Sequence, residues 1–216
     1  MRNRFEAQLQ ELNSEIISMG AMVESSIAAA ARALENRDTA LAKQVAGSDD
    51  VIDQKEREIE QLCLKLLLQQ QPVASDLRLI SAAMKMITDI ERIGDQAADI
   101  AELTLLLCQG DGISSAGKLK AMATATIHMV SGAIDAFVRR DLQLAREIME
   151  YDDVVDRQFD DIKASLVEAI HKDRDMGETA IDEMMIAKYF ERIGDHAVNI
   201  AEWVDFSITG NLLGSS

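Results

Sequence analysis

The sequence predicts an all-α fold made of two tandem three-helix bundles, that is, six long antiparallel helices related by an internal duplication. The first observation is composition: the chain of 216 residues is 48% hydrophobic but has only 4% aromatic residues and one proline, which favours long helices. The second is that apolar residues recur every three or four positions. The third is the pentapeptide Glu-Arg-Ile-Gly-Asp, which occurs at both 91–95 and 191–195.

Three helices are expected in the first repeat, which we place at residues 1–109. Apolar residues within 5–34 form one stripe along a helix of about eight turns. Asp38 is positioned to cap a second helix that ends at Pro72, and Ser75 is positioned to cap a third. Short connections favour antiparallel neighbours, so the three helices predict an up-and-down bundle.

The second repeat, placed at residues 114–209, follows a linker of glycine and polar residues at 109–112. It begins with a helix from about 119 to 138, after which Asp141 caps the next helix as Asp38 does in the first repeat. The last helix carries the second copy of the pentapeptide. Matching caps and motifs in the same order indicate that the chain arose by duplication.

Carboxylates gather on the third predicted helix of the first repeat. Glu91, Asp95 and Asp99 are spaced four residues apart, so each side chain lies about 40° further round the helix than the one before. The three carboxylates should form one ridge that faces away from the core of its own bundle, at the surface. The preceding helix carries Asp49 and Asp53, also four residues apart.

The second repeat carries a matching set in Asp152, Asp156, Glu191 and Asp195, with Asn199 in the place of the last acid of the ridge. Carboxylates at this spacing repel each other unless a cation lies among them. Hard oxygen ligands suit Mg²⁺, Ca²⁺, Mn²⁺ or Fe, and Zn²⁺ is a further candidate. We therefore predict a metal site in each repeat. In the second repeat Asn199 can offer one carbonyl oxygen to the ion. The alternative is a solvated acidic face without an ion.

The balance of charge limits the classes of partner. The formal net charge is −16, from 22 basic and 38 acidic residues, and such a surface repels the phosphate backbone of nucleic acids. The N-terminus lacks the apolar segment of a signal peptide, and no stretch approaches the roughly 18 apolar residues of a membrane span. Cys63 and Cys108 stand in no metal or redox motif. We expect a cytoplasmic protein.

One pattern points to a different function. Glu168 and His171 form an Glu-x-x-His motif, which di-iron carboxylate enzymes of the ferritin type use in pairs. Here the motif occurs once, beside a predicted helix end, so an oxygen-activating di-iron site is the alternative rather than the leading hypothesis. No nucleophile, base and orienting group occur together, and no phosphate-binding loop follows a strand. Nothing in the sequence points to catalysis.

One glycine lies inside the third helix of each repeat, Gly94 in the first and Gly194 in the second. Both indicate a close approach of a neighbouring helix, because glycine within a helix costs about 1 kcal/mol relative to alanine. His196 lies about 100° away from the acidic ridge and is expected to be a partly packed histidine and not a ligand.

The repeated motif resembles that of a known family. Both last helices read Glu-Arg-Ile-Gly-Asp-x-Ala-x-x-Ile-Ala-Glu, and the segment 72–78 reads Pro-Val-Ala-Ser-Asp-Leu-Arg. Together these motifs resemble the PhoU family, and the resemblance extends from about Phe5 to Phe206.

The resemblance implies a cytoplasmic, dimeric metal-binding regulator. In this family, motifs of two acids four residues apart bind metal ions or multinuclear clusters. Members of the family connect the phosphate ABC transporter, through its ATPase subunit, to a membrane sensor histidine kinase, and repress the phosphate-starvation response when phosphate is abundant; the resemblance implies the same role here. Contact with the membrane is then through protein partners. The residues that match these motifs are Asp49, Asp53, Glu91, Asp95, Asp99, Asp152, Asp156, Glu191 and Asp195.

Overall fold

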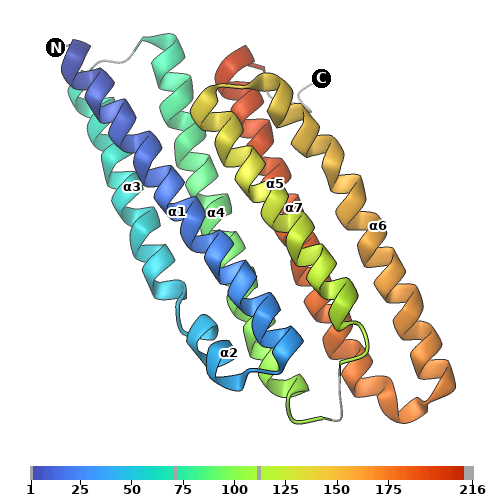
Figure 1. Cartoon of the computed structure of the whole chain (residues 1–216). Helices are drawn as coiled ribbons and strands as arrows, with labels where there is room; N and C mark the ends of the chain where they lie inside the picture. The colour runs from blue at the N-terminus through green and yellow to red at the C-terminus, as the bar shows by residue number, and fades with distance from the viewer. Residues whose placement is uncertain (1, 71–72, 111–112, 212–216) are drawn as a thin grey trace.

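The fold is a bundle in which the long helices lie roughly along one axis (Figure 1). The structure is a computed structural model that describes residues 2–70, 73–110 and 113–211. Within these residues the chain forms seven α-helices and one short 3₁₀ helix and no strand. The predicted all-α fold with two tandem helical units is confirmed. The exact domain boundaries, 1–109 and 114–209, stay predictions.

The first repeat contains four helices where three were predicted. They are α1 (Arg2–Asn36), α2 (Thr39–Ala46), α3 (Asp49–Gln70) and α4 (Ala74–Leu107). The additional helix arises because the predicted second helix is divided at Gly47 into α2 and α3. Asp38 caps α2, since its Oδ1 accepts hydrogen bonds of 3.0 Å from the backbone N–H groups of Ala40 and Leu41. Ser75 was wrongly predicted as a cap: α4 begins one residue earlier, after Val73.

The second repeat has the three predicted helices. They are α5 (Ala116–Arg139), α6 (Leu142–Lys172) and α7 (Gly177–Thr209), with the 3₁₀ helix η1 (Arg174–Met176) before α7. Asp141 caps α6 as predicted, and its Oδ1 accepts a hydrogen bond of 3.1 Å from the N–H of Leu144. Arg37 and Arg140 stand at the same place before α2 and α6, and both adopt left-handed φ values, 53° and 54°. Equivalent turns in the two repeats agree with the predicted duplication.

The two repeats meet along α4 and α7, which run antiparallel through the middle of the bundle (Figure 1). α1 and α5 also contact each other, so the repeats share one continuous apolar core. Isoleucines at equivalent positions, Ile100 and Ile200, are fully buried in this core. Consequently α4 is covered on several sides and its polar residues lie in seams between helices.

One helix, α5, is long and apolar enough to cross a membrane, which corrects the expectation that no stretch of the sequence approaches such a span. In this structure 56% of its apolar window is buried inside the protein. The apolar side chains of α5 face α1, α6 and α7. Its composition is therefore explained by its place in the core.

Candidate metal centre

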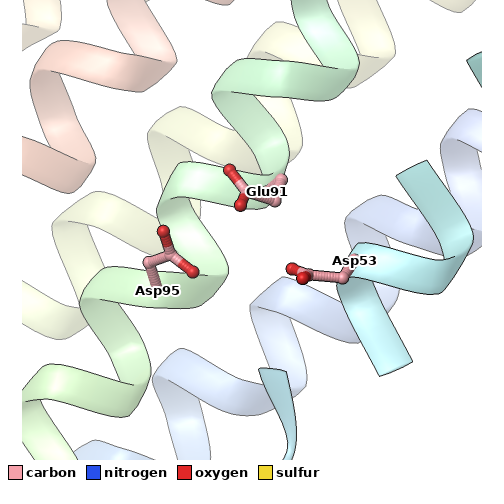
Figure 2. Close-up of side chains that lie close together, drawn as sticks. All are labelled: Asp53, Glu91 and Asp95. Atoms are coloured by element: carbon pink, nitrogen blue, oxygen red, sulfur yellow. The ribbon is translucent and has the colours of Figure 1, made fainter. Parts of the chain in front are cut away.

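Three carboxylates from two helices converge at the seam between α3 and α4. Asp53 comes from α3, and Glu91 and Asp95 come from successive turns of α4 (Figure 2). One oxygen from each residue lies within 4.8 Å of an oxygen of the other two. Within the described part of the chain, this is the single group of three or more acidic, histidine or cysteine side chains with that geometry.

The group is less exposed than the sequence predicted. The side chain of Glu91 is 14% exposed, that of Asp95 30% and that of Asp53 33%. The predicted outward-facing ridge is wrong in this respect, because α3 packs over that face of α4. Burial, followed by the nearby charge of Asp95, raises the pKa of Glu91 above its ordinary value.

A glycine sets the spacing of the two helices at this point. A Cβ atom on Gly94 would lie 2.8 Å from Cδ1 of Ile52, the residue that precedes Asp53. The absent side chain therefore allows α3 to approach α4 closely enough for their carboxylates to meet. In the second repeat a Cβ atom on Gly194 would lie 3.0 Å from Oδ1 of Asp152. The predicted close approach at both glycines is confirmed.

A fourth acid, Glu56, lies beside the group and was missed by the sequence analysis. Its charge contributes to the raised pKa of Glu91, after burial and the charge of Asp95. Its Oε1 accepts a hydrogen bond of 2.9 Å from Oγ1 of Thr88 on α4. Glu56 follows Asp53 by three residues, a helical spacing that signals a shared face.

Two arginines lie at the rim of the group. Arg92 pairs with Glu91 at 3.4 Å and with Asp95 at 3.0 Å, both on its own helix α4. Arg57 pairs with Asp53 at 3.5 Å, again on its own helix, α3. Both guanidinium groups belong to exposed side chains, so their attraction is screened by water.

The remaining predicted ligands of the first repeat are not part of the group. The side chain of Asp49 lies outside the described residues. Asp99 points to the other seam of α4: burial, and then the charge of Asp99, raise the pKa of Tyr189 on α7. The three acids of the predicted ridge thus face two different neighbours of α4. Helical periodicity gives the direction of each side chain around the helix axis, but it does not show which neighbouring helix packs on that side.

The acids of the second repeat are near one another but less tightly grouped. Among the described residues, no three of Asp152, Asp156, Glu191 and Asp195 bring oxygens within 4.8 Å of one another. Burial, and then the charges of Asp156, Asp195 and Glu191, raise the pKa of Asp152 to about 6. Nζ of Lys188 contacts the carboxylate of Glu191. One of these acids, Glu191, is thus paired with a cationic side chain of its own helix.

Asn199 does not offer its oxygen to the second group as predicted. Its Nδ2 donates a hydrogen bond of 3.1 Å to Oδ1 of Asp89 on α4. The same oxygen lies 2.9 Å from Nδ1 of His196, which is partly packed as predicted. Asn199 and His196 therefore join the two repeats.

The di-iron alternative is contradicted by the position of its motif. The side chain of Glu168 is 74% exposed and pairs with Lys172 at 3.9 Å, and His171 is also exposed. A di-iron site of this type needs both residues to project into the core of a bundle. They lie instead on the outer face of the last turn of α6.

The two repeats also differ at the seam beside the first group. A groove of about 530 Å³ lies between α1 and the start of α3, and Ser25 and Ser48 are on its walls. The equivalent positions in the second repeat are His128 and Tyr151, whose rings pack edge to face with centroids 4.8 Å apart. Small hydroxyl side chains in the first repeat thus correspond to two rings in the second.

The donor set at the first group fits a hard divalent cation. Asp53, Glu91 and Asp95 offer carboxylate oxygens from two directions, and Glu56 lies within reach of their charge. Mg²⁺, Mn²⁺ and Ca²⁺ prefer oxygen ligands and are commonly held by two or three carboxylates with water completing the shell. Like charges held together in a partly buried seam repel each other, and a cation there removes that repulsion.

Comparison with known proteins gives consistent results. The family model described as the PhoU domain matches residues 16–104 and again 119–204. The chain is 38% identical over 209 residues to the phosphate-specific transport system accessory protein PhoU homolog of Pseudomonas aeruginosa, covering 96% of this chain and 86% of that protein. It is 31% identical over 207 residues to the corresponding protein of Escherichia coli K12, covering 96% and 86%.

Two solved structures share the fold. The crystal structure of PhoU from Pseudomonas aeruginosa superimposes with a TM-score of 0.90 at 37% identity, covering 96% of this chain and all of that one (100%). The crystal structure of the phosphate transport system regulatory protein PhoU from Streptococcus pneumoniae gives 0.89 at 27% identity, covering 97% and 99%. The relatives are named as accessory or regulatory proteins and not as enzymes.

Proposed function

The chain belongs to the PhoU family, and we propose that it is a metal-binding regulatory adaptor of phosphate uptake. Both repeats match the family model, and the relatives are accessory proteins of phosphate-specific transport systems. A general role in phosphate regulation follows from that membership. The metal, the partners and the assembly described next are proposals.

The observation that supports metal binding is the convergence of Asp53, Glu91 and Asp95 from two helices. A divalent ion there would connect α3 to α4 through carboxylate oxygens and would neutralise a seam of a strongly acidic surface. Mg²⁺ and Mn²⁺ suit three carboxylates with open positions for water, and Ca²⁺, Zn²⁺ and Fe are the other candidates. With the ion bound, the seam becomes rigid and less repulsive to a protein partner.

The proposed partners are the ATPase subunit of the phosphate ABC transporter and the membrane sensor histidine kinase, as the family resemblance implies. The chain would act from the cytoplasm, as a homodimer, and would repress the starvation response when phosphate is abundant. A net charge of −16 disfavours nucleic acid and anionic lipid as direct partners. Contact with the membrane would therefore be made through the two proteins.

Thermal denaturation tests the metal proposal. An ion that binds only the folded state at 100 times its Kd adds about 2.7 kcal/mol of stability. For a chain of this size that corresponds to a rise in Tm of about 5–10 °C. We expect this rise with Mn²⁺ or Mg²⁺ in the wild type and in the control Glu168→Gln, and none in Asp53→Asn/Glu91→Gln. Equal shifts in all three proteins would contradict the proposal.

The regulatory role is tested in cells that lack the native gene. The tagged wild type should capture the ATPase subunit and the sensor kinase from phosphate-replete cells and keep a starvation-inducible reporter silent. Asp53→Asn/Glu91→Gln should fold but leave the reporter active. If the variant represses as well as the wild type does, the chain acts as a helical scaffold without a metal role, which is the remaining alternative.

A further inference from the structure

The residues beside the acidic groups differ between the repeats at three equivalent positions, one of which has Arg57 in the first repeat and Asp160 in the second. Alignment of the caps and of the repeated motif pairs Glu56 on α3 with Phe159 on α6, and Thr88 on α4 with Lys188 on α7. At the other two positions the first repeat has a carboxylate and a neutral hydroxyl beside its acids. The second has an aromatic ring and an ammonium group at the same two places.

Lys188 reaches across the seam between α7 and α6. Its Nζ contacts the carboxylate of Glu191 on its own helix and lies 5.7 Å from the ring centroid of Phe159 on α6. Burial and neighbouring carboxylates raise the pKa of Asp156, also on α6, and the charge of Lys188 opposes that rise. The ammonium thus interacts with acids of both helices. This is the position that a cation bridging the two helices would occupy.

The two arginines beside the first group are more exposed than Lys188, at 64% for Arg57 and 56% for Arg92 against 45%. Arg92 pairs with acids of α4, its own helix, and Arg57 pairs with Asp53 of α3, its own helix. The charge of Glu56 on α3 also acts on Arg92, but both ion pairs of Arg92 are with acids of α4. At the first group, Thr88 is the residue that corresponds to Lys188, and it carries no charge.

We infer that Lys188 is an internal cation that occupies, in the second repeat, the place of the divalent ion in the first, so that the chain binds its ion in the first repeat only. The inference rests on the proposed metal binding. A divalent ion entering the second group would have to displace an ammonium already paired with Glu191, against charge repulsion. The acids there also fail to bring three oxygens within 4.8 Å of one another in the part of the chain that is described.

The inference is tested by counting bound Mn²⁺ per chain in equilibrium dialysis, with manganese measured by elemental analysis. We expect about one ion in the wild type and about none in Asp53→Asn/Glu91→Gln. Asp156→Asn/Glu191→Gln should still bind about one. Lys188→Thr introduces the residue of the first repeat and should bind about two ions. Lys188→Gln should also bind about two, and it replaces Lys188→Thr in the test if that variant does not fold. The exposed Lys163→Thr changes net charge equally and should stay at one.

Each other outcome overturns a stated part of the account. Two ions in the wild type, or one ion in Lys188→Thr and Lys188→Gln, would overturn the role of Lys188 and leave metal binding intact. If the ion is lost from Asp156→Asn/Glu191→Gln but retained by Asp53→Asn/Glu91→Gln, the metal site lies in the second repeat, which contradicts the inference. No ion in the wild type would overturn the proposed function itself.

Discussion

Oδ1 of Asp89 on α4 lies 2.9 Å from Nδ1 of His196 on α7, and the same oxygen accepts a hydrogen bond of 3.1 Å from Nδ2 of Asn199. The residues come from different repeats. The equivalent pair on the other side of the seam is Tyr189 and Asp99. The pKa of Tyr189 is raised mainly by burial and, to a smaller extent, by the charge of Asp99. Polar groups of α4 and α7 thus interact across the seam at two positions related by the duplication.

We predict that Asp89→Ala lowers the free energy of unfolding by about 1–3 kcal/mol, because His196 and Asn199 both lose their partner in a partly buried seam. Tm should fall by about 2–10 °C. Asp135→Ala removes a carboxylate that pairs with Arg139 at 2.9 Å on the exposed face of α5 and serves as the control. That exposed pair should contribute less than about 1 kcal/mol. Equal losses in the two variants would show that the seam contact does not stabilise the fold.

Glu183 should be among the most sensitive acids in the chain. It is fully buried, and its carboxylate accepts hydrogen bonds from the backbone N–H groups of Ser114 (2.8 Å) and Ser115 (2.7 Å) just before α5. We expect Glu183→Ala to lose about 3–5 kcal/mol, since it leaves buried donors unpaired at the start of α5. Chemical denaturation measures the loss. A loss no larger than that of Glu168→Ala would contradict this role.

Gly94→Ala should destabilise the protein even though alanine is the better helix former. The new Cβ would lie 2.8 Å from Cδ1 of buried Ile52, and such overpacking costs about 1–3 kcal/mol. Ile52→Val removes the clashing methyl group. The double variant Gly94→Ala/Ile52→Val should therefore be at least as stable as Ile52→Val alone. If adding Ile52→Val to Gly94→Ala does not restore the Tm, the clash between the new Cβ and Cδ1 of Ile52 is not the cause of the destabilisation.

The raised pKa of Asp152 predicts a change of stability with pH. The folded protein binds this proton more tightly than the unfolded chain, because the pKa is about 6 when folded and 3.8 ordinarily. Its contribution therefore falls as pH rises from about 4 to about 6, and stays low above that. We expect Asp152→Asn, in the presence of a chelator, to gain about 1 kcal/mol at pH 8 after allowance for partial exposure, and almost nothing below pH 4. An equal effect at both pH values would point to a cause other than ionisation.

The helices and the duplication were predictable because their signals are local. Apolar spacing identified the long helices, and a capping aspartate before the second helix of each repeat was read directly from the chain. The division at Gly47 was not predicted, since the apolar pattern continues across it and one glycine is tolerated in a helix. Ser75 failed as a cap because the helix starts one residue before it.

The candidate site was only half predictable. Spacing placed Glu91, Asp95 and Asp99 on one ridge, but the packing of α3 and α7 on either side of α4 decided that the first two meet Asp53 and the third faces Tyr189. The rotation and tilt of neighbouring helices are tertiary properties that periodicity does not contain. Lys188 was missed for the same reason: its importance depends on what lies across the seam.

The most direct test of the central claim is a crystal grown with Mn²⁺ and measured at the manganese absorption edge. The account predicts one anomalous peak in each chain between Asp53, Glu91 and Asp95, about 2.0–2.6 Å from their carboxylate oxygens. No peak should appear beside Lys188. A structure at saturating Mn²⁺ without density among those three carboxylates would contradict the account.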